Sequence, residues 1–179
     1  RSESPVMRHT ARAVLERIPV AGWGDSIFKQ AVSFEVRGTG PAALSRGEIA
    51  ALSNWSAFLA LTRVAETSFQ PRVLSMLPIQ SFTNLSENER LTALRILSLP
   101  FIRLGAPDEA QRQAALNWLE PLYPNASPRV NQMLVELLVY LRSPQVVAKT
   151  VPLLRTATAS EDLLLYPFYL RYARAGWTP

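Results

Sequence analysis

The apolar residues of this chain recur with the period of an α-helix. The pattern is clearest over residues 128–141, where apolar side chains stand at i, i+3, i+4, i+7, i+8 and i+11: Val130, Met133, Leu134, Leu137, Leu138 and Leu141. This spacing places the side chains on one face of a helix. Shorter stripes run from Ala115 to Leu122 and through Leu165, Phe168, Tyr169 and Tyr172. From about residue 50 onward, the sequence therefore predicts a succession of helices.

A recurring dipeptide marks where these helices begin. A small polar residue followed by proline is typical of an N-cap and the first helical position. It occurs at Ser4-Pro5, Ser127-Pro128, Ser143-Pro144 and Thr178-Pro179, and Ser86 with Glu89 has the spacing of a capping box. The sequence thus predicts helical hairpins over about 50–79, 87–122 and 128–155. Flanking helices are expected over 5–18 and 161–175, and an irregular stretch over 19–47 with one short helix over 25–32.

The breaks between the predicted helices are periodic. Pro71, Pro107 and Pro144 are 36 and 37 residues apart. A period of this length with two helices per unit is typical of an α-solenoid. Four further prolines fall inside predicted helices, where each costs roughly 3 kcal/mol unless neighbouring helices hold the path: Pro100, Pro121, Pro152 and Pro167. We therefore predict an all-α fold, a right-handed α-solenoid of HEAT-like antiparallel helix pairs, with residues 1–179 forming one repeat domain.

Composition narrows the class of protein. The chain is 48% hydrophobic and 18% charged, which is typical of a folded domain. No apolar run approaches the ~20 residues that a bilayer crossing needs, so we expect no membrane insertion. Cysteine is absent, which excludes disulfides and cysteine-ligated metals within this segment. The net charge is +5 and all but two of the basic residues are arginines spread along the chain, which permits a polyanionic partner without requiring one.

The sequence offers no set of catalytic residues. His9 is the sole histidine, and we expect its side chain to pack against other residues or to lie at the surface. A zinc site would then need a carboxylate cluster, which the scattered Asp25, Asp108 and Asp162 do not suggest. Gly38-Thr39-Gly40-Pro41 lacks the Lys-Ser/Thr ending of a phosphate-binding loop. We therefore predict no enzymatic activity, no cofactor, and no catalytic, cofactor-binding or metal-ligating residue.

Three arginines are the candidate binding residues. Arg63, Arg103 and Arg142 lie near the ends of predicted helices, 40 and 39 residues apart. They could form an anion-binding ridge along the solenoid. The favoured interpretation is that each complements a helix C-terminus, worth ~0.3 to 1 kcal/mol.

Aromatic residues on the apolar stripes also have two interpretations. They could line a groove, or they could pack between repeats, which is the more common role of such side chains and the one that we favour. The set comprises Trp55, Trp118, Tyr123, Tyr140, Phe168, Tyr169 and Tyr172.

Three stretches resemble a known family. RILSLPFIRLGAPDEAQRQAALNWLEPLYP (95–124), LVELLVYLRSPQVVAKTVPLL (134–154) and GWTP (176–179) resemble the HEAT-like region of large exported proteins from planctomycetes and related bacteria. The resemblance covers roughly residues 50–179, and residues 8–23 show a weaker similarity to the same family. Relative to that family, residues 33–47 look like an insertion. The resemblance implies a parent protein in which a β-propeller resembling sugar dehydrogenases precedes the helical region and a c-type cytochrome module follows it.

These patterns lead to two functional hypotheses. The leading one is a non-enzymatic scaffold or protein-interaction domain, a fragment of a longer exported or periplasmic protein, which positions the neighbouring dehydrogenase-like and cytochrome modules. The alternative, motivated by the net charge, is a nucleic-acid-binding HEAT-like protein related to solenoids that repair alkylated DNA. A third hypothesis, a small enzyme with a site in the 19–47 loop, has less support.

Overall fold

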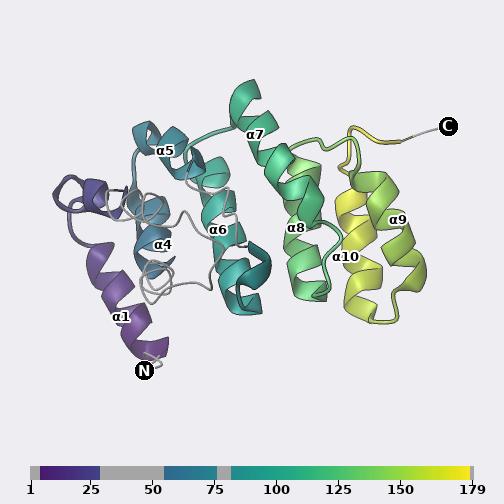
Figure 1. Cartoon of the computed structure of the whole chain (residues 1–179), viewed down its shortest axis with the longest axis horizontal. Coiled ribbons are helices and arrows are strands. Elements are labelled where there is room, and N and C mark those ends of the chain that lie inside the picture. The colour runs from purple at the N-terminus through teal and green to yellow at the C-terminus, as the bar shows by residue number, and fades with distance from the viewer. Residues whose placement is uncertain (1–4, 29–54, 76–81, 178–179) are drawn as a thin grey trace, which may run out of the picture. The chain divides into compact units, whose positions relative to one another are not determined.

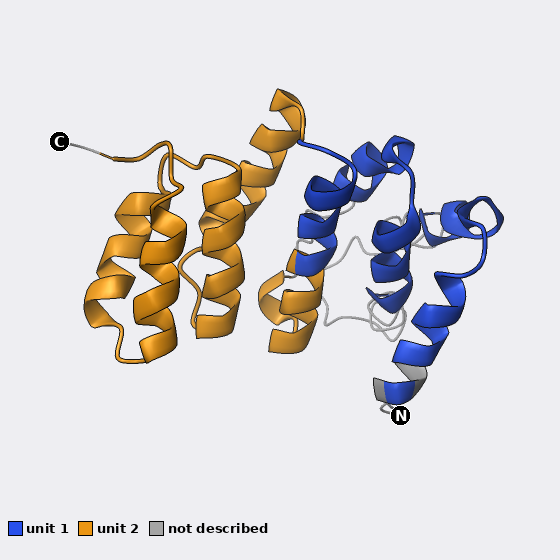
Figure 2. Cartoon of the chain, turned by 180° about the vertical axis from the view of Figure 1, so that it is seen from behind, with its two compact units in different colours: residues 1–79, 95–106 blue, residues 80–94, 107–179 orange. Residues whose placement is uncertain are grey.

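The structure is a computed structural model that describes residues 5–28, 55–75 and 82–177 (Figure 1). Every regular element in these ranges is a helix, which confirms the all-α prediction. The insertion predicted at 33–47, and residues 29–32 of the short helix predicted over 25–32, lie outside the described residues. The chain groups into two compact units, residues 1–79 with 95–106 and residues 80–94 with 107–179, so the division falls inside helix α6 (Glu87–Arg103) (Figure 2).

Unit 1 is built on the pairing of helices α1 and α4. Helix α1 (Pro5–Leu15) packs against α4 (Trp55–Val64), and Ala60 and Leu61 of α4 are fully buried. Between and after them lie the 3₁₀ turn η1 (Val20–Gly22), a helical turn at 24–28, η2 (Thr67–Phe69) and the short helix α5 (Gln70–Ser75). The C-terminal part of α6 completes the unit. The core of unit 1 is therefore a layer of apolar side chains between short helices.

Unit 2 is centred on helix α8. It contains the N-terminal part of α6 together with η3 (Phe82–Asn84), α7 (Glu109–Leu119), η4 (Glu120–Leu122), α8 (Pro128–Tyr140), α9 (Val146–Thr156) and α10 (Ser160–Leu170). Helix α8 packs against α7 and α9, and α10 packs against both α8 and α9 (Figure 1). The stripe predicted for α8 is confirmed, because Val130, Leu134 and Leu138 have no exposed surface.

Most predicted helix starts are confirmed, and one is displaced. The Ser127 hydroxyl accepts a hydrogen bond from the Val130 amide at 3.3 Å, and Ser86 and Glu89 form both bonds of a capping box. Helix α9, however, begins at Val146, two residues after Pro144. Residues 144 and 145 form a turn between the end of α8 and this helix.

The end of α8 is a Schellman motif with an arginine in the left-handed position. The Arg142 amide donates to the Val139 carbonyl, one of the two backbone bonds that define this motif. Arg142 has φ 57°, a conformation that glycine usually supplies. The Ser143 hydroxyl then accepts from the Gln145 amide, which turns the chain directly into α9. A single tight turn thus joins the two helices.

The chain after α10 returns to this turn. Gly176 has φ 85°, and a Cβ at this position would lie 2.6 Å from the Pro144 carbonyl oxygen. Glycine is therefore required at residue 176, both by its backbone conformation and by the close approach to the α8–α9 turn.

The prolines predicted inside helices take two different positions. Pro100, Pro152 and Pro167 do lie within α6, α9 and α10. Pro121 does not interrupt a helix, because α7 ends at Leu119 and Pro121 belongs to the 3₁₀ turn η4 that follows. Proline suits the start of such a turn, since it lacks only a donor that would find no partner there.

Replacing Arg142 with glycine tests the strain at this turn. Because an L-residue in the left-handed region costs about 1–2 kcal/mol and glycine adds back some unfolded-state entropy, Arg142→Gly should raise the free energy of unfolding by about 0.5–1 kcal/mol. Urea denaturation measures the change. Arg142→Ala is the control: it removes the charge and keeps the Cβ, so it should give no gain. An equal gain in both variants would mean that the charge, and not the backbone, sets the cost.

Candidate interaction surface

The three predicted arginines do not present three free cations. Arg63 lies at the end of α4, where its Nε is 2.8 Å from Oε1 of Glu16, the residue that follows α1. The Nη1 of Arg103 donates to the Thr62 carbonyl of the same helix α4 at 2.7 Å. Unit 1 therefore brings Arg63 and Arg103 to one helix end, and protein groups engage both. Arg142 belongs to unit 2 and is exposed at the end of α8.

Capping of a helix C-terminus by a side chain from elsewhere in its unit recurs through the described residues. In addition to Arg103, Gln70 donates to the Gly105 carbonyl at 2.9 Å after α6. In unit 2, Arg112 donates to the Leu141 carbonyl at 3.1 Å and Lys149 to the Glu120 carbonyl at 2.6 Å. The last carbonyls of a helix have no partner within it, so these bonds satisfy groups that would otherwise need water. They support the helix-end interpretation of the basic residues over the anion-binding ridge.

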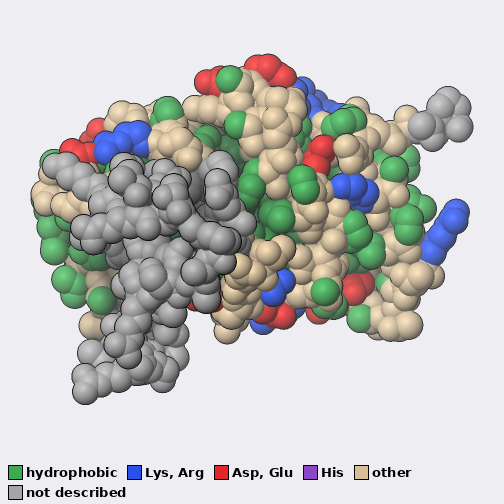
Figure 3. All heavy atoms as spheres, viewed as in Figure 1, with side chains coloured by type: hydrophobic (Ala, Val, Ile, Leu, Met, Phe, Trp, Pro, Cys, Tyr) green, Lys and Arg blue, Asp and Glu red, His purple; other side chains and the backbone are tan. Residues whose placement is uncertain are grey.

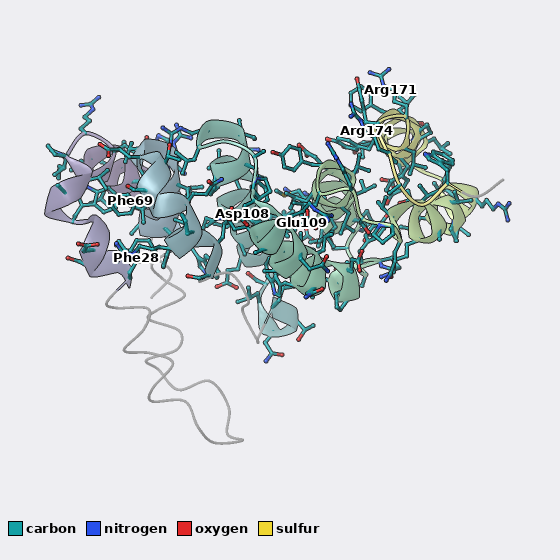
Figure 4. The ribbon with its side chains drawn as sticks, turned by 90° about the horizontal axis from the view of Figure 1, so that it is seen from above. Phe28, Phe69, Asp108, Glu109, Arg171 and Arg174 are labelled. Atoms are coloured by element: carbon teal, nitrogen blue, oxygen red, sulfur yellow. The ribbon has the colours of Figure 1, made fainter. Side chains whose placement is uncertain are left out.

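Other arginines are paired with carboxylates. Arg72 lies 2.6 Å from Asp25 and stacks over the ring of Phe28 at 4.1 Å, beside Phe69 (Figure 4). In the described part of unit 2, ion pairs join Arg112 to Glu109 and Arg129 to Glu87. On the face shown in Figure 3, blue basic side chains of the described residues lie near red acidic ones.

A buried hydroxyl pair ties the loop before α8 to α9. The Thr150 hydroxyl donates to the Val146 carbonyl at 2.6 Å, so the Tyr123 hydroxyl donates to Thr150 at 2.8 Å. Tyr123 is 2% exposed, and this burial raises the pKa of its phenol. Both protons are held by protein acceptors away from solvent. The pair therefore has a structural role and offers no group to a substrate.

Helix α10 carries apolar side chains on all of its sides. Tyr166 and Leu170 are buried against the rest of unit 2. On the opposite side, Leu164 is 75% exposed, Phe168 49% and Tyr172, just past the helix end, 54%. A helix that is apolar all round is normally covered all round. We call the outward side, formed by Glu161, Leu164, Phe168, Arg171 and Tyr172, the α10 surface.

An arginine stands between the aromatic rings of the α10 surface. The guanidinium of Arg171 lies 4.5 Å from the ring centre of Phe168 and 4.6 Å from that of Tyr172. Arg174 lies near it at the C-terminal end of α10 (Figure 4). Among the residues that the structure describes, neither Arg171 nor Glu161 has an ion-pair partner. The α10 surface thus combines exposed apolar area with one available charge of each sign.

Sequence reasoning assigned the wrong side of α10 to the core. The predicted stripe of Leu165, Phe168, Tyr169 and Tyr172 implied that Phe168 and Tyr172 are buried, and both are exposed. Tyr140, at the end of α8, is also exposed, whereas burial is confirmed for Tyr123. The cause is that leucine and aromatic residues surround α10, so periodicity cannot select one face. The informative signal was the lack of a polar side.

The remaining sequence candidates add no chemistry to this surface. The Nδ1 of His9 is 2.9 Å from Nη2 of Arg12 on the exposed side of α1. Within residues 5–28, 55–75 and 82–177, no group of three or more potential ligands could hold a metal ion. In the same ranges, no helix has the length and apolar character needed to cross a membrane.

Comparisons with protein-family models, with curated proteins and with solved structures find no match to this chain.

Substitution of Arg103 separates a structural role from ion binding. Arg103→Ala removes the cap on the Thr62 carbonyl and should lower the free energy of unfolding by about 1 kcal/mol, because the hydrogen bond comes from a charged donor and Arg103 is partly exposed. Arg95→Ala on the exposed side of the same helix α6 is the control, with an expected change within about 0.5 kcal/mol. Chemical denaturation at neutral pH measures both. Equal stability of the two variants would reject the capping role of Arg103.

Proposed function

We propose that this chain is a non-enzymatic helical-repeat scaffold that binds protein through the α10 surface. The observation that carries the proposal is the exposure of Leu164, Phe168 and Tyr172 on a helix whose other side is already packed. Exposed apolar and aromatic area beside arginine is typical of protein-binding sites. A solvated helix without a partner would present polar residues there instead.

The repeat architecture belongs to the same proposal. We infer that the helices stack as HEAT-like pairs in a right-handed solenoid. Support comes from the 36- and 37-residue spacing of the breaks, from the tight turn that pairs α8 with α9, and from the caps that one helix gives another. In such folds each unit buries its apolar face only against its neighbours. An apolar outer side on α10 is what a unit that receives another layer requires.

The resemblance to exported planctomycete-type proteins suggests the setting. In that setting, the helical region holds a sugar-dehydrogenase-like propeller and a c-type cytochrome module in a fixed relative geometry. The scaffold would itself supply no redox group. Its contribution would be the placement of surfaces, with the α10 surface as one of them.

The nucleic-acid alternative receives less support from the side chains. Of the arginines considered for an anion-binding ridge, Arg63 is paired with Glu16 and Arg103 is bonded to a carbonyl. Fluorescence titration with duplex DNA distinguishes the two functions: the scaffold predicts no measurable binding at low salt. Tight binding that weakens steeply as salt rises would instead establish the alternative.

Hydroxyl-radical footprinting tests the α10 surface directly. The side chains of Phe168 and Tyr172 should be modified severalfold less in the intact longer protein that the resemblance implies than in the 179-residue chain diluted until it is monomeric, because a protein partner excludes water from them. Tyr140, 47% exposed on α8 and outside this surface, is the control and should react equally in both. Unchanged reactivity of Phe168 and Tyr172 would reject the α10 surface as a protein-binding site.

A further inference from the structure

The α10 surface has the spacing of a helix-pairing seam. Glu161, Leu164, Phe168 and Arg171 are separated by three, four and three residues. This alternation of three and four keeps side chains on one side of a helix and lines the seam of two-stranded coiled coils. All four side chains are exposed. A second helix could therefore lie along this row without displacing any helix that packs against α10 now.

The row is also symmetric about its midpoint. Glu161 and Arg171 lie equally far on either side of residue 166, and so do Leu164 and Phe168. Suppose that the same row of a second copy lies antiparallel to this one. Leu164 of each copy then faces Phe168 of the other, and Glu161 of each copy faces Arg171 of the other. A two-fold contact demands this kind of self-complementarity, since residue i must suit residue j and residue j must suit residue i.

We propose that the partner at the α10 surface is a second copy of this chain, docked by antiparallel α10–α10 pairing about a two-fold axis. At the centre, Leu164 of each copy contacts Phe168 of the other, and these two apolar contacts exclude water. Two ion pairs between Glu161 and the partner copy's Arg171 flank them. The inference rests on the proposed function, because it names the occupant of the same surface.

The charges of Glu161 and Arg171 favour a second copy of the chain over a nucleic acid or a lipid surface. A nucleic acid or an anionic lipid surface would be attracted by Arg171 but repelled by Glu161 on the same row. A parallel pair of copies would set Glu161 against Glu161 and Arg171 against Arg171, so like charges disfavour that orientation. Only the antiparallel pair matches opposite charges throughout. Arg171 already stacks on Phe168 and Tyr172, which holds its guanidinium at the edge of the seam.

Charge reversal in the 179-residue chain tests the pairing. Sedimentation velocity over a concentration series should show a monomer–dimer equilibrium. Glu161→Arg and Arg171→Glu should each raise the dimer dissociation constant roughly tenfold, since either change sets two like-charged pairs across the seam. The double variant E161R/R171E should restore wild-type dimerisation, because the pairs are re-formed with the signs exchanged. Arg155→Glu, an exposed reversal at the end of α9, is the matched control and should leave the equilibrium unchanged.

A second set of measurements tests the apolar centre. Leu164→Asp should abolish the dimer while leaving the helical circular dichroism unchanged, because Leu164 contacts solvent in the monomer. Its unfolding midpoint should equal that of the wild-type chain diluted until it is monomeric. A wild-type chain that stays monomeric up to its solubility limit would overturn the inference, and so would a double variant no better than the single ones. If the chain is monomeric and footprinting still shows protection of Phe168 in the longer protein, the second copy is rejected and the proposed scaffold stands.

Discussion

Burial of helix α8 is the constraint on which unit 2 depends. Val130, Leu134 and Leu138 are completely withdrawn from water, and burying each such side chain contributes about 1.5–3 kcal/mol. No single neighbour could cover a stripe that broad, so α7, α9 and α10 must all lie against it. The position of α10 is therefore set by α8, and its outward side is whatever remains after that contact is made.

The helix ends create a second requirement, because their last carbonyls need hydrogen-bond donors, and basic side chains supply these donors. Short helices have many ends, and each end leaves carbonyls without partners. Arg103, Arg112 and Lys149 reach from other helices to satisfy them. Within the described residues, part of the positive charge is therefore used in bonds to backbone carbonyls. These three basic residues therefore join helices within a unit, whereas the exposed apolar residues of the α10 surface remain available to a partner.

The sequence predicted the helices well and the outer surface poorly, for identifiable reasons. The stripe of α8 and the cap at Ser127 follow local rules, namely helical period and N-cap chemistry, and the structure has both. The start of α9 was predicted two residues early because residues 144 and 145 form a turn after the Schellman motif of α8, and N-cap rules for a single helix do not take the preceding helix end into account. The exposure of Phe168 was unpredictable from periodicity, since α10 has apolar residues on every side.

The close approach of Gly176 to the Pro144 carbonyl links the two ends of the α8–α10 group. The segment that follows α10 rests on the turn between α8 and α9, because Gly176 lies close to the Pro144 carbonyl. Loss of that contact would free the segment and at the same time remove a support from the turn. The residues after α10 should consequently exchange their amide hydrogens in step with the α8–α9 turn, as one cooperative unit.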